Sequence, residues 1–493
     1  MAKPNYQDEY QIRLEKLKKI REQGINPYPN RFEKKQTIKE ILGLKLGAPV
    51  QTAGRLLTIR EMGKIAFCHL KDASGQIQFV FKQDQVGDKP FKEFLKFFDA
   101  GDFIGLKGEL FKTQKGEPSI LVKTYQLLGK ALRPMPEKWH GLKDTELKYR
   151  QRYLDLIANN ESYQRFLWRS ELIKTLREFY WQNGFIELET PILVNNASGA
   201  IAKPFKTHYQ ALDLDVYLRI APEIFLKEAI IGGFEKIFEI GRCFRNEGMD
   251  PSHLQDFTLV EHYVAYWNFE DNMKFSEEIF GYLLKKLFGK TKLMIKDQSG
   301  KEHEIDFKPP WPRVSFAELI KKDCGLDLKK YPTAEKLRTA IIAKKIKIDG
   351  AQNLGRGNLI DALYKQVCRD KIIKPTFALY HPTDLSPLAR KNDKDKEVVD
   401  RFQLVISGLE IVNAYSELVD PLDQKERFEK QVKAKAAGDA EAHGKDDEFV
   451  KALEYGSPPI SGWGLGLDRL VALLTCQDNL RDVVLFPLLR PKK

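Results

Sequence analysis

The alternation of apolar and polar residues divides the chain into two parts. Between residues 49 and 129, five short runs alternate apolar and polar positions as half-buried strands do. One segment with helical spacing lies inside this series at 89–99, and a basic amphipathic helix precedes it at 8–22. Five short strands with one helix between them predict a small Greek-key barrel of the OB type. We expect the barrel and the leading helix to form an N-terminal domain over residues 1–145.

The second part of the chain mixes helical and strand patterns. Between residues 160 and 310 helices alternate with strands, but several strands follow one another directly. This order favours a mixed, mostly antiparallel sheet flanked by helices over a doubly wound parallel sheet. We expect a helical insertion at 314–375, then a return to the sheet and a long final helix after Gly466. The prediction is an α+β multidomain protein whose second domain covers 146–493.

Composition and charge set only broad limits. With 42% hydrophobic and 30% charged residues, the 493-residue chain has an ordinary globular composition. It contains no apolar run long enough to span a bilayer, and its N-terminus lacks a signal-peptide core, so we expect a cytoplasmic protein without membrane contact. Five cysteines without metal-ligand spacing predict reduced thiols. The net charge of +12 fits either a polyanionic partner or a solvated lysine-rich surface.

One segment carries the side chains that a nucleoside triphosphate requires. Residues 244–257 read FRNEGMDPSHLQDF, a predicted strand–loop–strand. Arg245 offers a guanidinium for phosphate oxygens, Glu247 can accept from an adenine amino group, and Phe257 offers a ring on which a base can stack. This combination is typical of an ATP site.

A second segment, GWGLGLDRL at 462–470, reads as a glycine-rich strand that runs into a helix with Arg469 at its start. Arg245 and Arg469 lie on separate elements, so they can hold a triphosphate from two sides. The sequence contains no GxxxxGK[ST] loop. We therefore expect side chains, and not a phosphate-binding loop, to hold the phosphates.

From about residue 10 to the C-terminus, the chain resembles the class II lysyl-tRNA synthetases. GFIELETPIL at 184–193 is similar to the first class II motif, with Pro191 at the dimer-forming strand, and the two segments above are similar to the second and third. The strings that favour lysine over other amino acids are AKPFKTHYQALDLDVYLRIAPE at 202–223, SPLAR at 386–390 and EIVNAYSEL at 410–418.

This resemblance implies an aminoacyl-tRNA synthetase that ligates L-lysine to the 3′ end of tRNA(Lys). ATP would be the second substrate, a lysyl-adenylate the intermediate, and AMP and pyrophosphate the released products. The resemblance also implies Mg²⁺, a homodimer, and an anticodon-binding role for the barrel. Positioning and charge neutralisation would supply most of the acceleration, which agrees with the absence of a Ser/His/Asp or Cys/His set from the sequence.

The resemblance assigns catalytic roles to three cationic side chains. Arg245 would bridge the α-phosphate and the amino-acid carboxylate, while His253 and Arg469 would reach the β- and γ-phosphates. Taken alone, His253 would more often be an ordinary surface histidine. The implied ATP site consists of Arg245, Glu247, His253, Phe257, Glu410 and Arg469.

A lysine pocket must pair a buried ammonium at the end of a four-carbon stem, because an unpaired charge there would be very costly. The resemblance assigns this ammonium to Glu417 and Tyr263 and places Tyr415 along the stem. Structural roles remain open for Tyr263 as a core aromatic and for Glu261 as a scaffold carboxylate. The implied lysine site consists of Gly199 (through its carbonyl), Glu223, Arg245, Glu261, Tyr263, Asn413, Tyr415 and Glu417.

The expected metal site departs from the family pattern. The family holds magnesium with two glutamates; here Glu410 stands at one position and Gln403 at the other. RFQLVISGLEIV predicts a hairpin that turns at Ser407–Gly408 and brings both side chains to one face. A Gln carbonyl can still ligate a hard cation, but one negative charge is lost. We expect weaker magnesium binding, or one ion fewer, than at a two-glutamate site.

The second motif also departs from the family, which reads HNPEF where this chain has Leu254, Gln255 and Asp256 after His253. Asp256 keeps the charge on a shorter side chain, and the turn lacks its proline. We expect a different loop over ATP and over the acceptor end of tRNA.

In the barrel, the resemblance assigns anticodon binding to three residues. Phe67 would stack on a base, while Arg60 and Gln78 would bind the edge of that base. Without the resemblance, Phe67 would more often be a core residue of the barrel.

Three rival functions are considered. A paralogue that transfers lysine to a protein would generally lack the barrel, and an aspartate or asparagine ligase would need cationic groups in place of Glu417. A catalytically weakened RNA-binding relative would tolerate loss of Arg245, Glu247 or Arg469, and all three are present.

Overall fold

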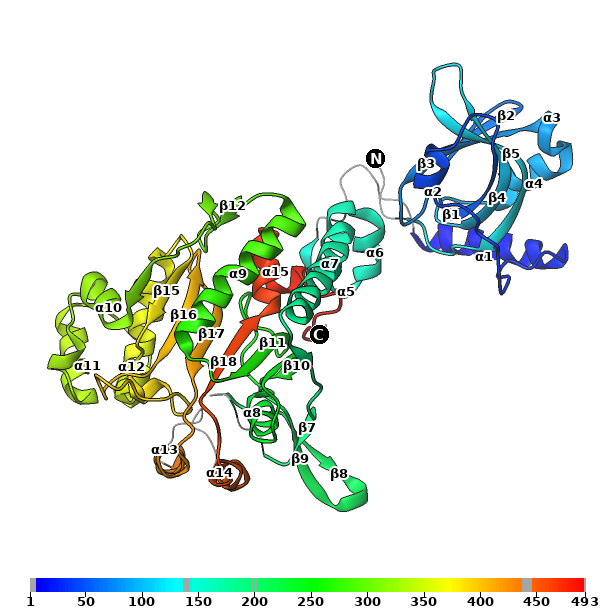
Figure 1. Ribbon diagram of the computed structural model, residues 1–493. Helices are drawn as coiled ribbons and strands as arrows, with labels where there is room; N and C mark the ends of the chain where they lie inside the picture. The colour runs from blue at the N-terminus through cyan, green and yellow to red at the C-terminus, as the bar shows by residue number, and fades with distance from the viewer. Residues whose placement is uncertain are drawn as a thin grey trace. The chain divides into compact units, whose positions relative to one another are not determined.

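A computed structural model divides the chain into two compact units, Met1–Lys143 and Asp144–Lys493 (Figure 1). Each unit has its own apolar core. The structure describes residues 6–135, 142, 144–196, 199, 202–436 and 446–491.

The first unit is a closed five-stranded barrel in which neighbouring strands follow the order β1-β2-β3-β5-β4. Alternate side chains face inward; in β2 these are Ala66, Cys68 and Leu70. The elements are α1 (Tyr6–Glu22), α2 (Ile38–Leu42), β1 (Pro49–Met62), β2 (Ile65–Lys71), β3 (Gln76–Lys82), α3 (Gln83–Val86), α4 (Asp88–Phe97), β4 (Phe103–Lys112) and β5 (Pro118–Gly129). The predicted OB-type barrel is confirmed.

The second unit is built on an eight-stranded sheet in the order β14-β15-β16-β17-β18-β11-β10-β6. Neighbours pair antiparallel except at the two edges, where β14–β15 and β10–β6 are parallel. The strands are β6 (Ile186–Glu187), β10 (Lys236–Phe244), β11 (Asp256–Ala265), β14 (Arg313–Ser315), β15 (Thr376–Leu379), β16 (Arg401–Ile406), β17 (Leu409–Ser416) and β18 (Ile460–Gly466). The mixed, mostly antiparallel sheet is confirmed. Smaller sheets contain β7 (Leu193–Val194), β8 (Lys206–Tyr209) and β9 (Leu214–Leu218), and β12 (Lys292–Lys296) and β13 (Glu302–Asp306).

One face of the large sheet is covered by helices α7 and α9, and the main core lies between them and the strands (Figure 1). Trp463 of β18 is buried in this core and donates from Nε1 to Ser276 Oγ at 2.8 Å. The helices of the unit are α5 (Thr145–Arg150), α6 (Arg152–Ala158), α7 (Asn160–Gln182), α8 (Glu223–Ile231), α9 (Phe269–Phe288), α10 (Phe316–Cys324), α11 (Ala334–Ala343), α12 (Arg356–Leu363), α13 (Pro421–Ala436), α14 (Asp447–Glu454) and α15 (Leu467–Leu474). Over the part of the chain that the structure describes, no helix has the length and apolar composition to cross a membrane.

The opposite face of the sheet is less completely covered. Tyr263 of β11 points to this face and packs in a small apolar cluster with α8. Because side chains alternate along a strand and Trp463 points to the other face, Gly462 and Gly464 of β18 also fall on this side. The absence of side chains at these two positions leaves room in the middle of the sheet.

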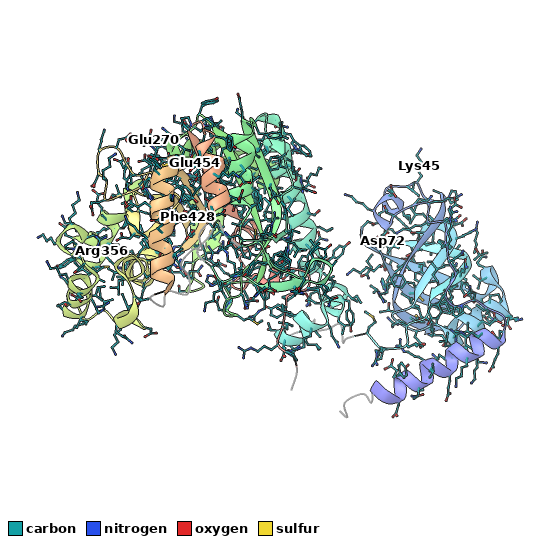
Figure 2. All side chains as sticks on the ribbon, turned by 90° about the horizontal axis from the view of Figure 1, so that it is seen from below. Lys45, Asp72, Glu270, Arg356, Phe428 and Glu454 are labelled. Carbon is teal, nitrogen blue, oxygen red and sulfur yellow. The ribbon has the colours of Figure 1, made fainter. Side chains whose placement is uncertain are left out.

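Between β14 and β15 the chain forms α10, α11 and α12, which share a separate apolar cluster, in the segment 314–375 where an insertion is expected. Arg356, labelled in Figure 2, begins α12 and forms an ion pair with Asp384 at 2.7 Å. This pair joins the helices to the segment that follows β15.

Two local predictions are wrong. The helix after Gly466 is not long, because α15 ends at Leu474, where the apolar pattern stops; Cys476 then adopts a left-handed φ of 53°. Pro191, expected at a strand, lies exposed between β6 and β7.

Candidate active site

A cleft of about 320 Å³ opens on the less covered face of the large sheet. Its walls come from segments far apart in the sequence, including the β10–β11 loop, β17, β18 and the start of α15. The predicted residues that line it are Gly199, Glu223, Arg245, Glu247, His253, Phe257, Glu261, Glu410, Asn413, Tyr415 and Arg469. The fold therefore brings most of the predicted ATP and amino-acid residues to one site.

One part of the cleft is cationic. Arg469 donates from Nη1 to the main-chain oxygen of Glu410 at 3.1 Å, and its Nη2 lies 3.5 Å from Nε2 of His253. Nδ1 of His253 lies 2.8 Å from Oδ2 of Asp250, a contact that orients the ring with Nε2 toward Arg469. Although burial lowers the pKa of Arg469, a guanidinium remains charged at neutral pH.

Arg245 follows β10, in the strand–loop–strand that the sequence predicts. Its Cζ atom lies 4.9 Å from the centre of the Phe257 ring, so the guanidinium packs against the predicted base-stacking ring. Its Nε atom is buried and makes no hydrogen bond to any residue in the described ranges. The Arg245 guanidinium therefore retains an N–H donor that can bind an oxyanion.

An acidic group of side chains begins at the cleft: Glu223 and Glu261 line it, whereas the predicted residues Glu417 and Tyr263 do not. Glu223 accepts a hydrogen bond from Lys227 Nζ at 2.6 Å and another from the Tyr415 hydroxyl at 2.7 Å. Lys227 also forms an ion pair with Glu417, and both side chains are almost fully buried. Oε1 of Glu417 is buried and has no hydrogen-bond partner among the described residues. Burial is the main cause that raises the pKa of Glu417, although Lys227 opposes it.

Lys227 is a site residue that sequence reasoning missed. It follows Glu223 by four residues on α8, so both side chains lie on the same side of the helix. The available signal was a lysine four residues after Glu223 in the mostly apolar stretch EIFLKEAII. A lysine that is 1% exposed needs acidic partners, and such partners are found only in the fold.

Glu261 and Tyr263 lie on the same face of β11, and the Tyr263 hydroxyl donates to Glu261 Oε2 at 3.1 Å. Burial raises the pKa of Glu261 to about 8. Gly462 of β18 is in register with both Tyr263 and Tyr415, its neighbours on the adjacent strands. A Cβ atom on Gly462 would lie 2.3 Å from Oε1 of Glu417. The absence of a side chain at Gly462 thus makes the room that this carboxylate oxygen and the Tyr263 ring occupy.

Gly199 and Asn413 complete the predicted amino-acid set. Gly199 has a φ of 93° and is closely packed, since a Cβ there would lie 3.1 Å from Cβ of Glu223. Oδ1 of Asn413 accepts from Nε of Arg401 at 2.8 Å. Arg401, which also lines the cleft, is a second residue that the sequence analysis did not identify.

The proposed metal ligands lie together as the hairpin predicts. Ser407 and Gly408 both have positive φ angles, 50° and 76°, as a two-residue turn between β16 and β17 requires. Gln403 donates from Nε2 to Oε2 of Glu410 at 3.0 Å. The Gln403 side chain also lies beside the buried ring of His381, and an amide oxygen is a group that can ligate a hard cation. Within the described ranges, no cluster of three or more His, Cys, Asp and Glu side chains could hold a metal by itself.

The altered turn of the second motif is held by contacts of its own. Gln255 donates from Nε2 to the main-chain oxygen of Gly248 at 3.0 Å. Asp256, at the start of β11, pairs with Arg242 of β10 at 2.5 Å. The first contact joins two residues of the loop that carries Glu247, and the second joins the two strands at its base.

On the barrel, the three predicted anticodon residues share one region of surface. Arg60 of β1 and Phe67 of β2 are directly opposite each other, and Gln78 of β3 is opposite His69, two residues after Phe67. Phe67 is half-buried and Arg60 is exposed. The Gln78 amide is engaged within the barrel: it donates to Glu117 at 3.0 Å and accepts from Ser119 at 2.9 Å.

Comparison with known families matches both units. Residues 144–490 match the family described as tRNA synthetases class II (D, K and N). Residues 50–128 match the OB-fold nucleic acid binding domain.

Similar proteins cover almost the whole chain. A lysine–tRNA ligase of Thermosipho africanus is 47% identical over 97% of this chain and 95% of its own length. The lysine–tRNA ligases of Syntrophomonas wolfei and Bacillus cytotoxicus are 46% and 44% identical and cover 98% and 99% of the chain, with 97% and 98% of their own lengths. The cleft, the barrel and these matches agree, and the chain belongs to the class II tRNA synthetase family.

Proposed function

We propose that this protein ligates L-lysine to the 3′ end of tRNA(Lys) in two steps, with ATP as the second substrate. The carboxylate of lysine attacks the α-phosphate of ATP, which gives lysyl-adenylate and releases pyrophosphate. The terminal ribose of tRNA then attacks the acyl carbon of the adenylate, and AMP leaves.

The observation that carries this proposal is the division of one cleft into a cationic and an acidic part. Arg245 and Arg469 supply fixed positive charge for phosphate and carboxylate oxygens. Glu223, Glu261 and Glu417 supply buried acceptors for ammonium groups. The three carboxylates outnumber the single cation among them, Lys227, which disfavours an aspartate or asparagine substrate.

The direct test is amino-acid-dependent exchange of pyrophosphate into ATP, measured over a panel of amino acids, followed by charging of tRNA. We expect exchange with lysine and at least about 100-fold lower kcat/KM with neutral side chains, because these would leave Glu417 unpaired. Exchange without charging of any tRNA would favour transfer of lysine to a protein. Absence of lysine-dependent exchange would contradict the proposal.

Lysine binding should release a proton near neutral pH. The pKa of Glu261 is raised to about 8 by burial, and a bound ammonium favours the ionised carboxylate. We therefore expect the affinity for lysine to rise with pH up to about 8 and then to level off. Conversely, the free protein should lose stability as the pH rises from the unfolded value of 4.5 toward 8, because the folded carboxyl group binds the proton more tightly.

Titration calorimetry in two buffers with different ionisation enthalpies measures this proton release. The heat of lysine binding should differ between the buffers at pH 7 for the native protein. The difference should shrink in Glu261→Gln. Equal heats in the two buffers for the native protein would contradict the prediction.

We further propose that Mg²⁺ accompanies ATP and is held by Glu410 and the Oε1 atom of Gln403. The ion would neutralise phosphate charge, and Gln403 would supply a neutral oxygen where a carboxylate would add charge. Gln403→Glu should tighten the binding of Mn²⁺, used as a Mg²⁺ substitute, in the presence of a non-hydrolysable ATP analogue. Gln298→Glu is a matched control, because Gln298 contacts the same hairpin through the Ser407 oxygen at 3.5 Å.

Electron paramagnetic resonance of Mn²⁺ gives the number and affinity of bound ions, and a magnesium titration of adenylate formation gives the requirement. Unchanged ion binding and an unchanged magnesium requirement in Gln403→Glu would refute the assignment of Gln403.

We propose that the barrel binds the anticodon through Arg60, Phe67 and Gln78. Phe67→Ala should raise KM for tRNA about 10- to 100-fold, because a stacked base loses its platform. Pyrophosphate exchange should stay unchanged, because this reaction does not use tRNA. A variant that loses exchange and charging equally would indicate a folding defect instead of lost anticodon contact.

A homodimer is also proposed, as the family resemblance implies. Exposed apolar side chains gather in sequence around the first motif and just before it: Trp181, Ile186, Ile192 and Leu193. Large exposed apolar groups often mark an interface. Sedimentation equilibrium tests this proposal, with an expected mass of twice 56.9 kDa.

A further inference from the structure

Lys227 is an unusual group to find inside a pocket for a cationic substrate. Its ammonium lies between Glu223 and Glu417, the two carboxylates that the proposed function assigns to different ends of lysine. The rings of Tyr415 and Phe449 lie 5.7 and 5.6 Å from Nζ and close the site around it. The two carboxylates and two rings therefore surround Nζ within the protein.

The surroundings suggest a purpose other than stability. A buried ion pair contributes little net stability compared with apolar residues of similar volume. Apolar partners are already present, since Phe449 of α14 belongs to the cluster that includes Ile224 of α8. A leucine or methionine at 227 would leave Glu223 and Glu417 buried without this cation, so the charge of Lys227 has to be explained together with the two carboxylates.

The charges around Lys227 provide a functional explanation for its ammonium group. The facing ionisable groups are Glu223 on the same helix, Glu261 and Tyr263 on β11, and Tyr415 and Glu417 at the end of β17. Arg401 approaches Tyr415 from β16, and Glu239 of β10 is already paired with Arg219 at 2.5 Å. When all three carboxylates are ionised, as bound ammonium groups favour, they and Lys227 leave two negative charges, and lysine brings two ammonium groups.

Geometry makes the same division at Glu417. Lys227 pairs with Oε2, while Oε1 is buried against Gly462 and the Tyr263 ring and forms no ion pair or hydrogen bond with the described residues. One oxygen is thus paired with a cation of the protein and the other is not. Without Lys227, Glu417 would be a buried carboxyl group with no cation beside it in the free protein.

We propose that Lys227 is a positioning residue that determines specificity: it favours the ionised form of Glu417 and orients this side chain so that the oxygen without a cation selects a distal ammonium. This inference rests on the proposed function, in which lysine is the substrate. Loss of the Lys227 charge would let Glu417 take up a proton and become a neutral acid. A neutral acid can accommodate the neutral end of an isosteric amino acid such as norleucine.

The test compares Lys227→Met, Lys227→Gln and Lys227→Arg in pyrophosphate exchange with lysine and with norleucine. In the two neutral variants, the ratio of kcat/KM for lysine to that for norleucine should fall at least about 100-fold. The pH at which KM for lysine levels off should rise by about 1 unit or more, because a cation no longer favours the ionised acid. Lys227→Arg should keep the ratio of kcat/KM for lysine to that for norleucine within about 10-fold of the native value. The pH at which KM for lysine levels off should stay within about 1 unit of the native value.

Glu228→Gln is the matched control, because Glu228 is the next residue of α8 and faces Asp446 and Glu448 outside the pocket. It should leave the ratio and the pH profile unchanged. Weaker lysine binding with an unchanged ratio and pH profile in the neutral variants would show a purely structural role and overturn the inference. Failure of all three Lys227 variants to fold would also overturn it, because the ammonium would then serve the core. Absence of lysine-dependent exchange in the native protein would instead reject the proposed function itself.

Discussion

Replacing Glu417 with Gln should lower kcat/KM for lysine about 10²- to 10⁴-fold in pyrophosphate exchange. The buried ammonium would lose its carboxylate, and an uncompensated buried charge costs about 3–5 kcal/mol. The side chain is 2% exposed, so water cannot replace the lost charge. Lys227 would also lose one of its two partners, which adds to the effect.

Two controls accompany Glu417→Gln: a second amino-acid substrate, norleucine, and a second variant, Glu417→Asp. For norleucine, the same substitution should leave kcat/KM unchanged or raise it, because no ammonium reaches the site. Glu417→Asp, which keeps the charge on a shorter side chain, should fall between Gln and the native protein. An equal loss of kcat/KM for lysine and norleucine would mean that Glu417 stabilises the fold and does not recognise the side chain of the substrate.

Replacing Arg245 with Lys should reduce kcat for adenylate formation about 10²- to 10³-fold, the range seen when one donor to a transition-state charge is removed. A lysine keeps the charge but cannot bridge two anions as a planar guanidinium can. It would also give up the packing of the guanidinium over Phe257, at 4.9 Å. Pre-steady-state measurement of lysyl-adenylate formation separates this step from product release.

Arg242→Lys is the matched control, because Arg242 is three residues away on β10 and pairs with Asp256 at the surface. A surface pair contributes about 0–1 kcal/mol, so kcat should change only a few-fold. If Arg245→Lys raises KM for ATP and leaves kcat unchanged, then Arg245 binds the ground state and not the transition state.

Local sequence patterns predicted the barrel, and they placed Arg245 and Arg469 on separate elements, which the fold brings to one cleft. Strand alternation gives the face of each residue, so Ala66, Cys68 and Leu70 could be assigned to the barrel interior. The turn at Ser407–Gly408 follows from the same reasoning, because a two-residue loop between strands determines which side chains lie opposite. These inferences need only neighbours in the chain or across one turn.

Contacts between distant segments could not be predicted in this way. The pairing of Lys227 with Glu417 joins residues 190 positions apart on a helix and a strand. The engagement of the Gln78 amide by Glu117 and Ser119 depends on the closure of β3 against β5. The early end of α15 also escaped the sequence analysis, because Gly466 marks the start of a helix but not its length.

The most direct test of the account is a crystal structure with lysine and a non-hydrolysable ATP analogue bound together. We predict that the distal nitrogen of lysine lies within hydrogen-bond distance of Oε1 of Glu417, with Lys227 still on Oε2, and that Arg245 contacts both the carboxylate and the α-phosphate. A lysine bound with its distal nitrogen away from Glu417, or with Arg245 remote from the α-phosphate, would contradict the account.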